Sequence, residues 1–171
     1  MAEGRKPLVT PFGVYAYVLA AAVVVLDQLS KWWVINIAHL DLKGQIPVLP
    51  FFRLTDVQNL GVSFGLMRAD TPAGRWRLVA AAAVVVVCLI VWARRAERPL
   101  FATALGLVIG GAIGNNLIDR ARIGYVVDFL DFSGLWFPWV FNVADSAISV
   151  GVVLLLWDSF FPGKTATETA A

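Results

Sequence analysis

AAAVVVVCLIVW, residues 81–92, is the stretch that decides the fold. It contains no charged side chain and lies within a predominantly apolar segment, residues 76–93. A helix needs about 20 mostly apolar residues to cross the hydrocarbon core of a bilayer. Three further segments meet this requirement, so the sequence predicts four membrane spans, at 12–34, 76–93, 99–119 and 137–158. We expect an all-α integral membrane protein that forms a single membrane domain over residues 1–171.

The overall composition argues against a soluble domain. Of the 171 residues, 59% are hydrophobic and only 15% are charged, whereas soluble domains carry about 25% charged residues. A soluble bundle of four such helices would have almost no polar faces. The first apolar segment runs from Phe12 to Leu26 with no small-residue cleavage site after it, so we expect a retained span, not a cleavable signal peptide.

The tryptophans mark the expected ends of these spans. Indole rings prefer the headgroup level of a bilayer, where they form an aromatic belt. None of the seven tryptophans falls at the centre of a predicted span, and all lie near an end: Trp32, Trp33, Trp76, Trp92, Trp136, Trp139 and Trp157.

The charges between the spans predict the orientation. An even number of spans places both termini on one side, and the turn ARRAERP (93–99) is rich in arginine. Together with Arg5, Lys6 and Lys164, this turn is expected in the cytoplasm. On the outer side, residues 36–75 alternate apolar and polar side chains between Pro and Gly, which predicts a small β-like region of short strands and turns. The small, polar tail 162–171 is expected to be disordered.

Ionisable residues converge on the outer ends of the spans. A charge at the centre of a membrane helix costs at least about 2.5–3.5 kcal/mol, so each such residue is a functional candidate. Residues spaced three or four apart share a helix face, which groups Asp27 with Lys31, Asn116 with Asp119 and Arg120, and Asn142 with Asp145. The charge-balanced groups fit a structural role equally well.

Asp128 and Asp145 differ from these groups because neither has a basic residue within four positions and both have apolar neighbours. Two carboxyls brought together in an apolar site cannot both ionise, so they share a proton. One then acts as a base toward water and the other as an acid toward a carbonyl, as in aspartic proteases. The alternative is a pair of interfacial aspartates at helix starts. Asp131 is a weaker candidate because its neighbours are more polar.

Other chemistries find little support. With one cysteine (Cys88) and one histidine (His39), a zinc site of the usual Cys/His type cannot be assembled, and we expect no metal or cofactor. GVSFG (61–65) matches a serine nucleophile motif, but that motif needs a histidine base and a strand-turn-helix setting. No basic, aromatic-rich stretch predicts nucleic-acid binding. A small proton- or ion-translocating membrane protein is the main alternative, although transporters place their acids near the midplane and in repeated halves.

Five blocks of the sequence resemble the lipoprotein signal peptidase (signal peptidase II) family, in its order and spacing: DQLSK (27–31), QNLGVSFG (58–65), GGAIGNNLIDR (110–120), VVDFLDF (126–132) and FNVADSAI (141–148). The resemblance implies a multi-pass protein of the bacterial cytoplasmic (inner) membrane, with cytoplasmic termini and an active site at the outer leaflet. It implies cleavage of diacylglyceryl-modified prolipoproteins just before the lipidated cysteine, without metal or cofactor. We expect a monomer in contact with membrane lipids.

The family's catalytic aspartates fall on Asp128 and Asp145. Asn59 and Gly61 would hold peptide backbone, and Arg120 would anchor the end of the third span. The supporting residues implied by the resemblance are Asp27, Lys31, Asn59, Gly61, Asp119, Arg120, Asn142 and Ala144. The family pattern has two residues between its asparagine and the Asp-Arg pair, whereas GNNLIDR has one more. Counting from Gly111 selects Asn115; counting back from Asp119 selects Asn116, which we favour because it shares the Asp119 and Arg120 face.

Overall fold

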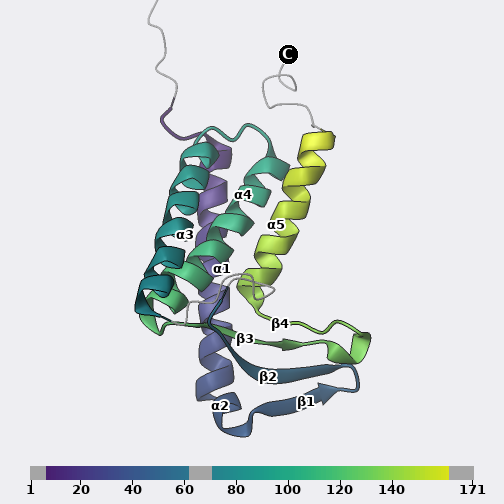
Figure 1. The fold of residues 1–171 in the computed structure, drawn as a ribbon. Helices are drawn as coiled ribbons and strands as arrows, with labels where there is room; N and C mark the ends of the chain where they lie inside the picture. Colours follow the sequence, from purple (N-terminus) through teal and green to yellow (C-terminus); the bar gives the residue numbers. More distant parts are fainter. Residues whose placement is uncertain (1–6, 62–70, 162–171) are drawn as a thin grey trace, which may run out of the picture.

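Four long apolar helices form the body of the protein (Figure 1). The computed structural model describes residues 7–61 and 71–161. The helices long and apolar enough to cross a membrane are α1 (Pro11–Asn36), α3 (Pro72–Ala93), α4 (Pro99–Ala112) with its continuation η2 (Ile113–Arg120), and α5 (Val143–Phe160). The predicted four-span fold is therefore confirmed. Most of the GVSFG motif and the tail 162–171 lie outside the described residues.

The helix starts follow from local sequence. Proline stands at the first turn of α1, α3 and α4, where its missing N–H leaves no helical hydrogen bond unmade. The hydroxyls of Thr10 and Thr71 cap α1 and α3 by accepting the N–H groups of Gly13 and Gly74. Helix α5 begins with a capping box between Asn142 and Asp145.

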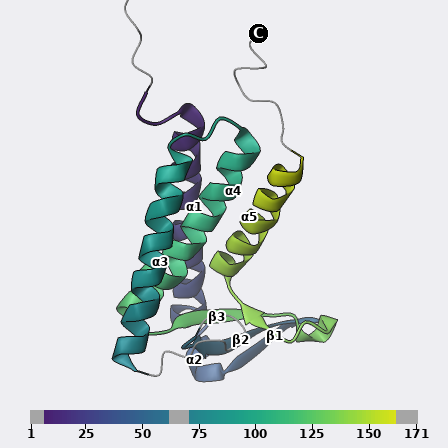
Figure 2. The ribbon, with the colours of Figure 1, turned by 45° about the horizontal axis from the view of Figure 1, so that its top comes forward.

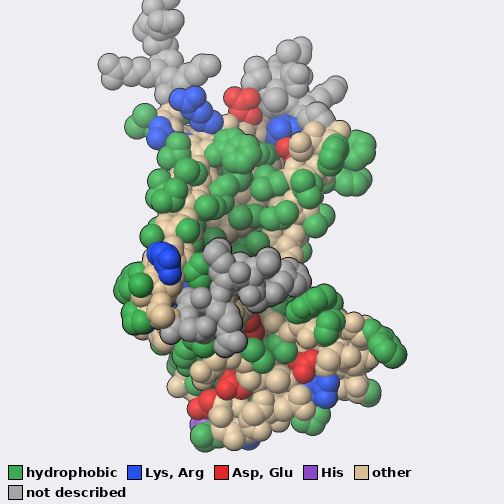
Figure 3. Space-filling model, in the orientation of Figure 1, with side chains coloured by type: hydrophobic (Ala, Val, Ile, Leu, Met, Phe, Trp, Pro, Cys, Tyr) green, Lys and Arg blue, Asp and Glu red, His purple; other side chains and the backbone are tan. Residues whose placement is uncertain are grey.

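Helix α4 packs between α1 and α5, as Figures 1 and 2 show. Glycines make the close approach possible: a Cβ at Gly106 or Gly110 would lie 2.7 or 2.6 Å from backbone oxygens of α1. Gly151 of α5 lies equally close to the backbone of α4. These contacts fit the packing role expected for small residues at four-residue spacing. Outward-facing side chains of the helices are hydrophobic, and charged ones gather toward the ends of the molecule (Figure 3).

An antiparallel sheet lies across one end of the helices (Figure 2). Its strands follow the order β1 (Gln45–Leu49), β2 (Phe52–Asn59), β3 (Val126–Asp131) and β4 (Val140–Phe141). A short helix, α2 (Leu40–Lys43), connects α1 to β1. The α3–α4 turn, the start of α1 and the end of α5 lie at the end of the helices opposite the sheet.

Two sequence expectations need correction. The fourth span begins at Val143 and not near residue 137, because Pro138 interrupts the segment and Asn142 supplies the helix cap. The preceding residues form a one-turn helix, η3 (Ser133–Leu135), and strand β4. Half of the strands therefore come from residues after the third span, beyond the predicted 36–75 region. Trp136 and Trp139 lie in this hairpin and not at a helix end.

The last part of the third span is a π-helix, η2. A π-helix bonds residue i to residue i+5, so it holds one more residue per turn than the flanking α-helix, and it is frequent at functional sites. Segment GNNLIDR, which has one residue more than the family spacing, lies entirely within η2. The π-helix therefore coincides with the segment that has the additional residue.

Candidate active site

Asp128 and Asp145 come from different elements and meet at one residue, Asn142. Asp128 lies on strand β3, and Asp145 lies in the first turn of α5. The Asn142 side-chain amide donates to Asp128 Oδ1 at 2.7 Å, and its backbone N–H donates to Asp145 Oδ2 at 3.2 Å. The capping box thus fixes both carboxylates by the same residue. The predicted pair is brought together.

The pleat of the sheet aims Asp128 toward the helices. Asp128 is opposite Val57 and Asn59 is opposite Val126, so these four side chains share one face. Asn59 donates from Nδ2 to Asp128 Oδ2 at 3.0 Å. Asp128 is only 2% exposed and has no ion pair with a described residue. Burial and the negative charge of Asp145 raise the pKa of Asp128 from 3.8 to about 7, against the opposing effect of the two asparagine amides.

Asp145 is held from two sides. Its Oδ2 accepts from the Asn142 backbone, and its Oδ1 accepts the side-chain amide of Asn115 at 2.8 Å. The Asn115 carbonyl in turn accepts from Lys31 Nζ at 2.7 Å. A single amide therefore connects a buried ammonium group to this carboxylate.

Lys31 is the centre of a buried ionic group. Its ammonium has three N–H donors, which are met by Asn115, by Asp27 Oδ2 at 2.8 Å and by Asp119 Oδ2 at 2.7 Å. Asp27 also accepts the backbone N–H of Ala144 at 3.1 Å. Because Ala144 precedes Asp145, this bond ties the start of α5 to α1. The expected pairing of Asp27 with Lys31 is thus present, and Asp119 joins it, so that two carboxylates share one ammonium group.

Arg120 anchors the chain that leaves strand β2. Its guanidinium donates to the carbonyls of Leu60 and Gly61 at 3.1 and 2.7 Å. The Gly61 N–H donates to the Asn59 side-chain oxygen at 3.0 Å. This oxygen contact leaves the Asn59 amide free to bind Asp128. Arg120 therefore positions Asn59 through Gly61, and does more than hold the end of the third span.

Of the two candidate asparagines, Asn115 is the one that contacts Asp145. Asn116 donates to the Ala112 carbonyl and accepts from Arg120 Nε at 3.3 Å, so it shares a face with Arg120 as expected. The contacts in the π-helix therefore favour Asn115 as the residue beside the aspartate pair. Gln28 was missed altogether. Its amide donates to Asp119 and Asp27 at 2.9 and 3.1 Å, and its position within DQLSK was the available signal.

Asp131 lies away from the pair, on the sheet rim. It accepts from the Thr55 hydroxyl and the Ser133 backbone at 2.7 and 2.9 Å and pairs with Arg53 at 3.7 Å. Although burial opposes this effect, the hydrogen bonds and Arg53 lower the pKa of Asp131. Its environment is that of a structural carboxylate.

A cavity of about 170 Å³ lies against Asp145. Water occupies about 30 Å³ in the liquid, so the cavity has room for a few water molecules beside Asp145. Its walls come from β2, β3, the π-helix and α5: Asn59, Gly61, Asn115, Asn116, Arg120, Val126, Asp145 and Ile148.

Comparisons with known proteins agree on one family. The family model described as Signal peptidase (SPase) II matches residues 19–161. A lipoprotein signal peptidase of Caulobacter vibrioides is 55% identical over 152 residues, which cover 89% of this chain and 90% of that protein. A lipoprotein signal peptidase of Rhizorhabdus wittichii is 45% identical, with 91% and 89% covered.

Solved structures share the fold. One described as a bacterial membrane enzyme, at 2.3 Å resolution, has a TM-score of 0.75 at 24% identity and covers 94% of this chain and 98% of its own. A second, at 1.9 Å, has a TM-score of 0.73 at 26% identity, with 92% and 100% covered. With four membrane-spanning helices and nearly full-length matches, the chain belongs to the signal peptidase II family and is a multi-pass membrane peptidase of the aspartic type.

Proposed function

We propose that this protein removes the signal peptide from lipid-modified prolipoproteins, with Asp128 and Asp145 as the catalytic pair. The scissile bond is the one just before the diacylglyceryl-modified cysteine. The relatives described as lipoprotein signal peptidases support the substrate class. The observation that carries the residue assignment is the sharing of Asn142 by both carboxylates.

The pair holds a single proton in this mechanism. Asp128 carries the proton, because burial and the neighbouring Asp145 raise its pKa to about 7, so that its neutral form is populated near neutral pH, and no described cation contacts it. Asp145 is the base, connected to Lys31 through Asn115. Water adds to the scissile carbonyl carbon as its proton moves to Asp145, and Asp128 gives its proton to the carbonyl oxygen. The C–N bond then breaks as the leaving amine takes the proton from Asp145 and the hydroxyl proton returns to Asp128.

The remaining site residues act by positioning this pair. Asn59 and Asn142 orient Asp128, and Asn115 orients Asp145. Asp27 holds the backbone of Ala144 and so sets where α5 begins. All of these residues come from one chain, so we propose that a single chain is the active unit.

We further propose that the sheet lies at the outer leaflet of the bacterial inner membrane and that both termini are cytoplasmic. The arginine-rich turn 94–98 lies at the end of the helices opposite the sheet, the same end as the start of α1 and the end of α5. Positively charged short loops remain preferentially on the cytoplasmic side.

The assignment is tested with Asp128→Asn and Asp145→Asn in purified protein and a lipid-modified precursor. Each substitution is expected to lower cleavage by about 10³-fold or more, because each removes either the proton donor or the base. Asp131→Asn is the matched control, since it changes a buried carboxylate on the same strand as Asp128. Turnover by either dyad variant within ten-fold of the unmodified protein would remove the pair from the mechanism.

A further inference from the structure

A second cavity lies on the other side of the sheet from Asp128. Its volume is about 690 Å³, which is within the range of about 300–1,000 Å³ typical of small-molecule sites. Side chains alternate across a strand, so Asp128 shares a sheet face with Asn59 and Val126, which line the catalytic cavity. Their neighbours Val127 and Gln58 face this larger one. The two cavities therefore lie on opposite faces of the strands, and neither Asp128 nor Asp145 lines the larger one.

One wall of the large cavity faces lipid. Val25, Leu29 and Trp32 line it from α1 at i, i+4 and i+7, and each is more than half exposed. These residues belong to a membrane-spanning helix and lie near its sheet end. A molecule bound here would have an apolar surface beside it, running along α1 into the bilayer.

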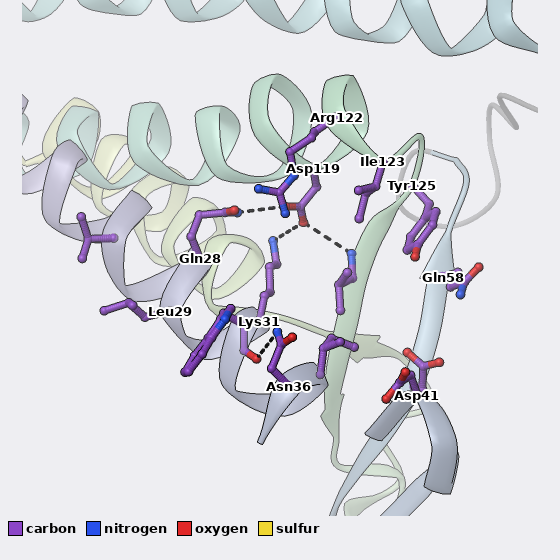
Figure 4. Close-up of a pocket in the computed structure, with 15 residues that line it drawn as sticks. Gln28, Leu29, Lys31, Asn36, Asp41, Gln58, Asp119, Arg122, Ile123 and Tyr125 are labelled. Carbon is purple, nitrogen blue, oxygen red and sulfur yellow. Dashed lines mark hydrogen bonds and ion pairs between the residues drawn. The ribbon is translucent and has the colours of Figure 1, made fainter. Parts of the chain in front are cut away.

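The inner wall is polar, but its N–H donors already form hydrogen bonds within the protein. Gln28, Lys31 and Asp119 close the cavity on the side of the catalytic centre (Figure 4). All three N–H donors of Lys31 are used within the protein, and both N–H donors of Gln28 are used as well. The buried ammonium group is thus not available to hold a ligand anion.

Unpaired charges of both signs stand around the opening. Arg122 is exposed and forms no ion pair or hydrogen bond with a described residue. Asp41 and Asp56, from α2 and β2, likewise have no basic partner among the described residues. Burial and the neighbouring charge of Asp41 raise the pKa of Asp56. Figure 4 shows Arg122 at one end of the cavity and Asp41 at the other.

We propose that this cavity binds the headgroup of a zwitterionic aminophospholipid. The lipid phosphate would pair with Arg122, the primary ammonium would lie between Asp41 and Asp56, and the acyl chains would follow the apolar face of α1. A singly anionic headgroup would satisfy Arg122 but would leave both carboxylates unpaired. A bound amine would relieve their mutual repulsion. The lipid would lie one hydrogen-bond relay from the active site, through Lys31 and Asn115 to Asp145.

The proposal is tested by native mass spectrometry of the purified full-length protein. The probes are phosphatidylethanolamine, phosphatidylglycerol and phosphatidylcholine with identical acyl chains, present together in detergent. The protein is expected to retain phosphatidylethanolamine in preference to the other two. Arg122→Gln should reduce that retention by about ten-fold, the effect of losing one charge-assisted hydrogen bond. Asp41→Asn combined with Asp56→Asn should abolish the preference over phosphatidylglycerol.

Arg77→Gln is the matched control, because Arg77 is also exposed at the sheet end of a span but does not line the cavity. Its lipid retention should equal that of the unmodified protein. Equal losses in Arg122→Gln and Arg77→Gln, or equal retention of all three lipids, would show nonspecific boundary lipid and overturn the proposal. Soluble phosphoethanolamine should not displace the lipid at millimolar concentration. Displacement would show that the site takes a free phosphate compound and would overturn the assignment to a lipid.

Discussion

Asp128 and Asp131 lie on the same short strand, yet their environments change their acidity in opposite directions. Asp128 is buried beside another carboxylate and has no ion pair with a described residue, whereas Asp131 accepts hydrogen bonds from Thr55 and Ser133. The strand places one on the catalytic face and the other on the rim. Because the two pKa values shift in opposite directions, the pH dependence of protein stability can distinguish the two environments.

Asp128→Asn should make the folded protein more stable at pH 8. The folded-state pKa of Asp128 is raised from 3.8 to about 7, so ionisation destabilises the folded protein. The favourable contribution of the neutral acid is complete below about pH 4 and is lost as pH rises through about 7. Asp128→Asn removes this loss. The free energy of unfolding of the variant should exceed that of the unmodified protein at pH 8 by an amount on the order of a few kcal/mol, and the difference should disappear near pH 4. The measurement is the thermal midpoint in detergent, which should be higher for the variant at pH 8.

Asp131→Asn should change the stability at pH 8 in the opposite direction. A depressed pKa gives stability that is present above the unfolded value and is lost as pH falls through the folded one. This substitution should therefore lower the thermal midpoint at pH 8 and have little effect in acid. If both variants shift the midpoint in the same direction at pH 8, the two environments have been assigned incorrectly.

At the scale of elements, the approach of α4 and η2 to α1 has a functional as well as a packing role. Gly106 and Gly110 meet backbone oxygens of α1, but a Cβ at Gly114 would lie 2.7 Å from the side-chain Oδ2 of Asp27. This oxygen is the one that accepts from Lys31 and Gln28. Gly106 and Gly110 therefore allow close packing of the helices, and Gly114 leaves room for the ionic group around Lys31.

Gly114→Ala should reduce cleavage by about ten- to a hundred-fold, because it displaces Asp27 and through it the start of α5. Gly106→Ala is the comparison variant, since the atoms nearest to its added Cβ belong to Ala16 and Leu19 and not to the ionic group. Both substitutions should lower the thermal midpoint, so turnover is measured well below either one. Similar turnover in the two variants would mean that Gly114 serves packing alone.

The π-helix leads to a deletion experiment. Removing one asparagine from GNNLIDR restores two residues between the asparagine and the Asp-Arg pair. We expect the wide turn to close into an α-helix, so that the remaining asparagine still reaches Asp145 and turnover stays within about three-fold. Deleting Leu107 from the regular part of the same span should instead rotate the glycine face and abolish activity. Loss of turnover on deletion of Asn116 would show that the π-helix itself is required.

Sequence reasoning succeeded where the signal was periodic or compositional. The apolar runs located the four spans, and Asp128 and Asp145, the predicted pair, both bond to Asn142. It failed where geometry depends on neighbours. Strand β3 is almost entirely buried and lacks the polar alternation of an exposed strand. The sequence therefore predicted strands only within residues 36–75. The choice between Asn115 and Asn116 depended on a helical pitch that the sequence alone does not reveal.

At the scale of the whole molecule, the two ends of the helices differ in charge arrangement, and this difference predicts the orientation. Trp136, in the β3–β4 hairpin, is 97% exposed, and Glu97 is exposed in the turn at the opposite end. Cys88 is the only cysteine, so Cys88→Ser provides a background for single-cysteine variants. In intact spheroplasts, an impermeant maleimide should label Trp136→Cys, whereas Glu97→Cys should react only after lysis.

The unmodified protein, which keeps Cys88, is the separate control for this experiment, because Cys88 lies on the lipid-facing surface of α3 and should resist the reagent in both conditions. Labelling of Glu97→Cys before lysis, with Trp136→Cys protected, would place the sheet in the cytoplasm. The ionic group of Lys31 would then face the wrong compartment for a substrate exported across the membrane. The orientation thus determines whether the catalytic pair can meet its proposed substrate at all.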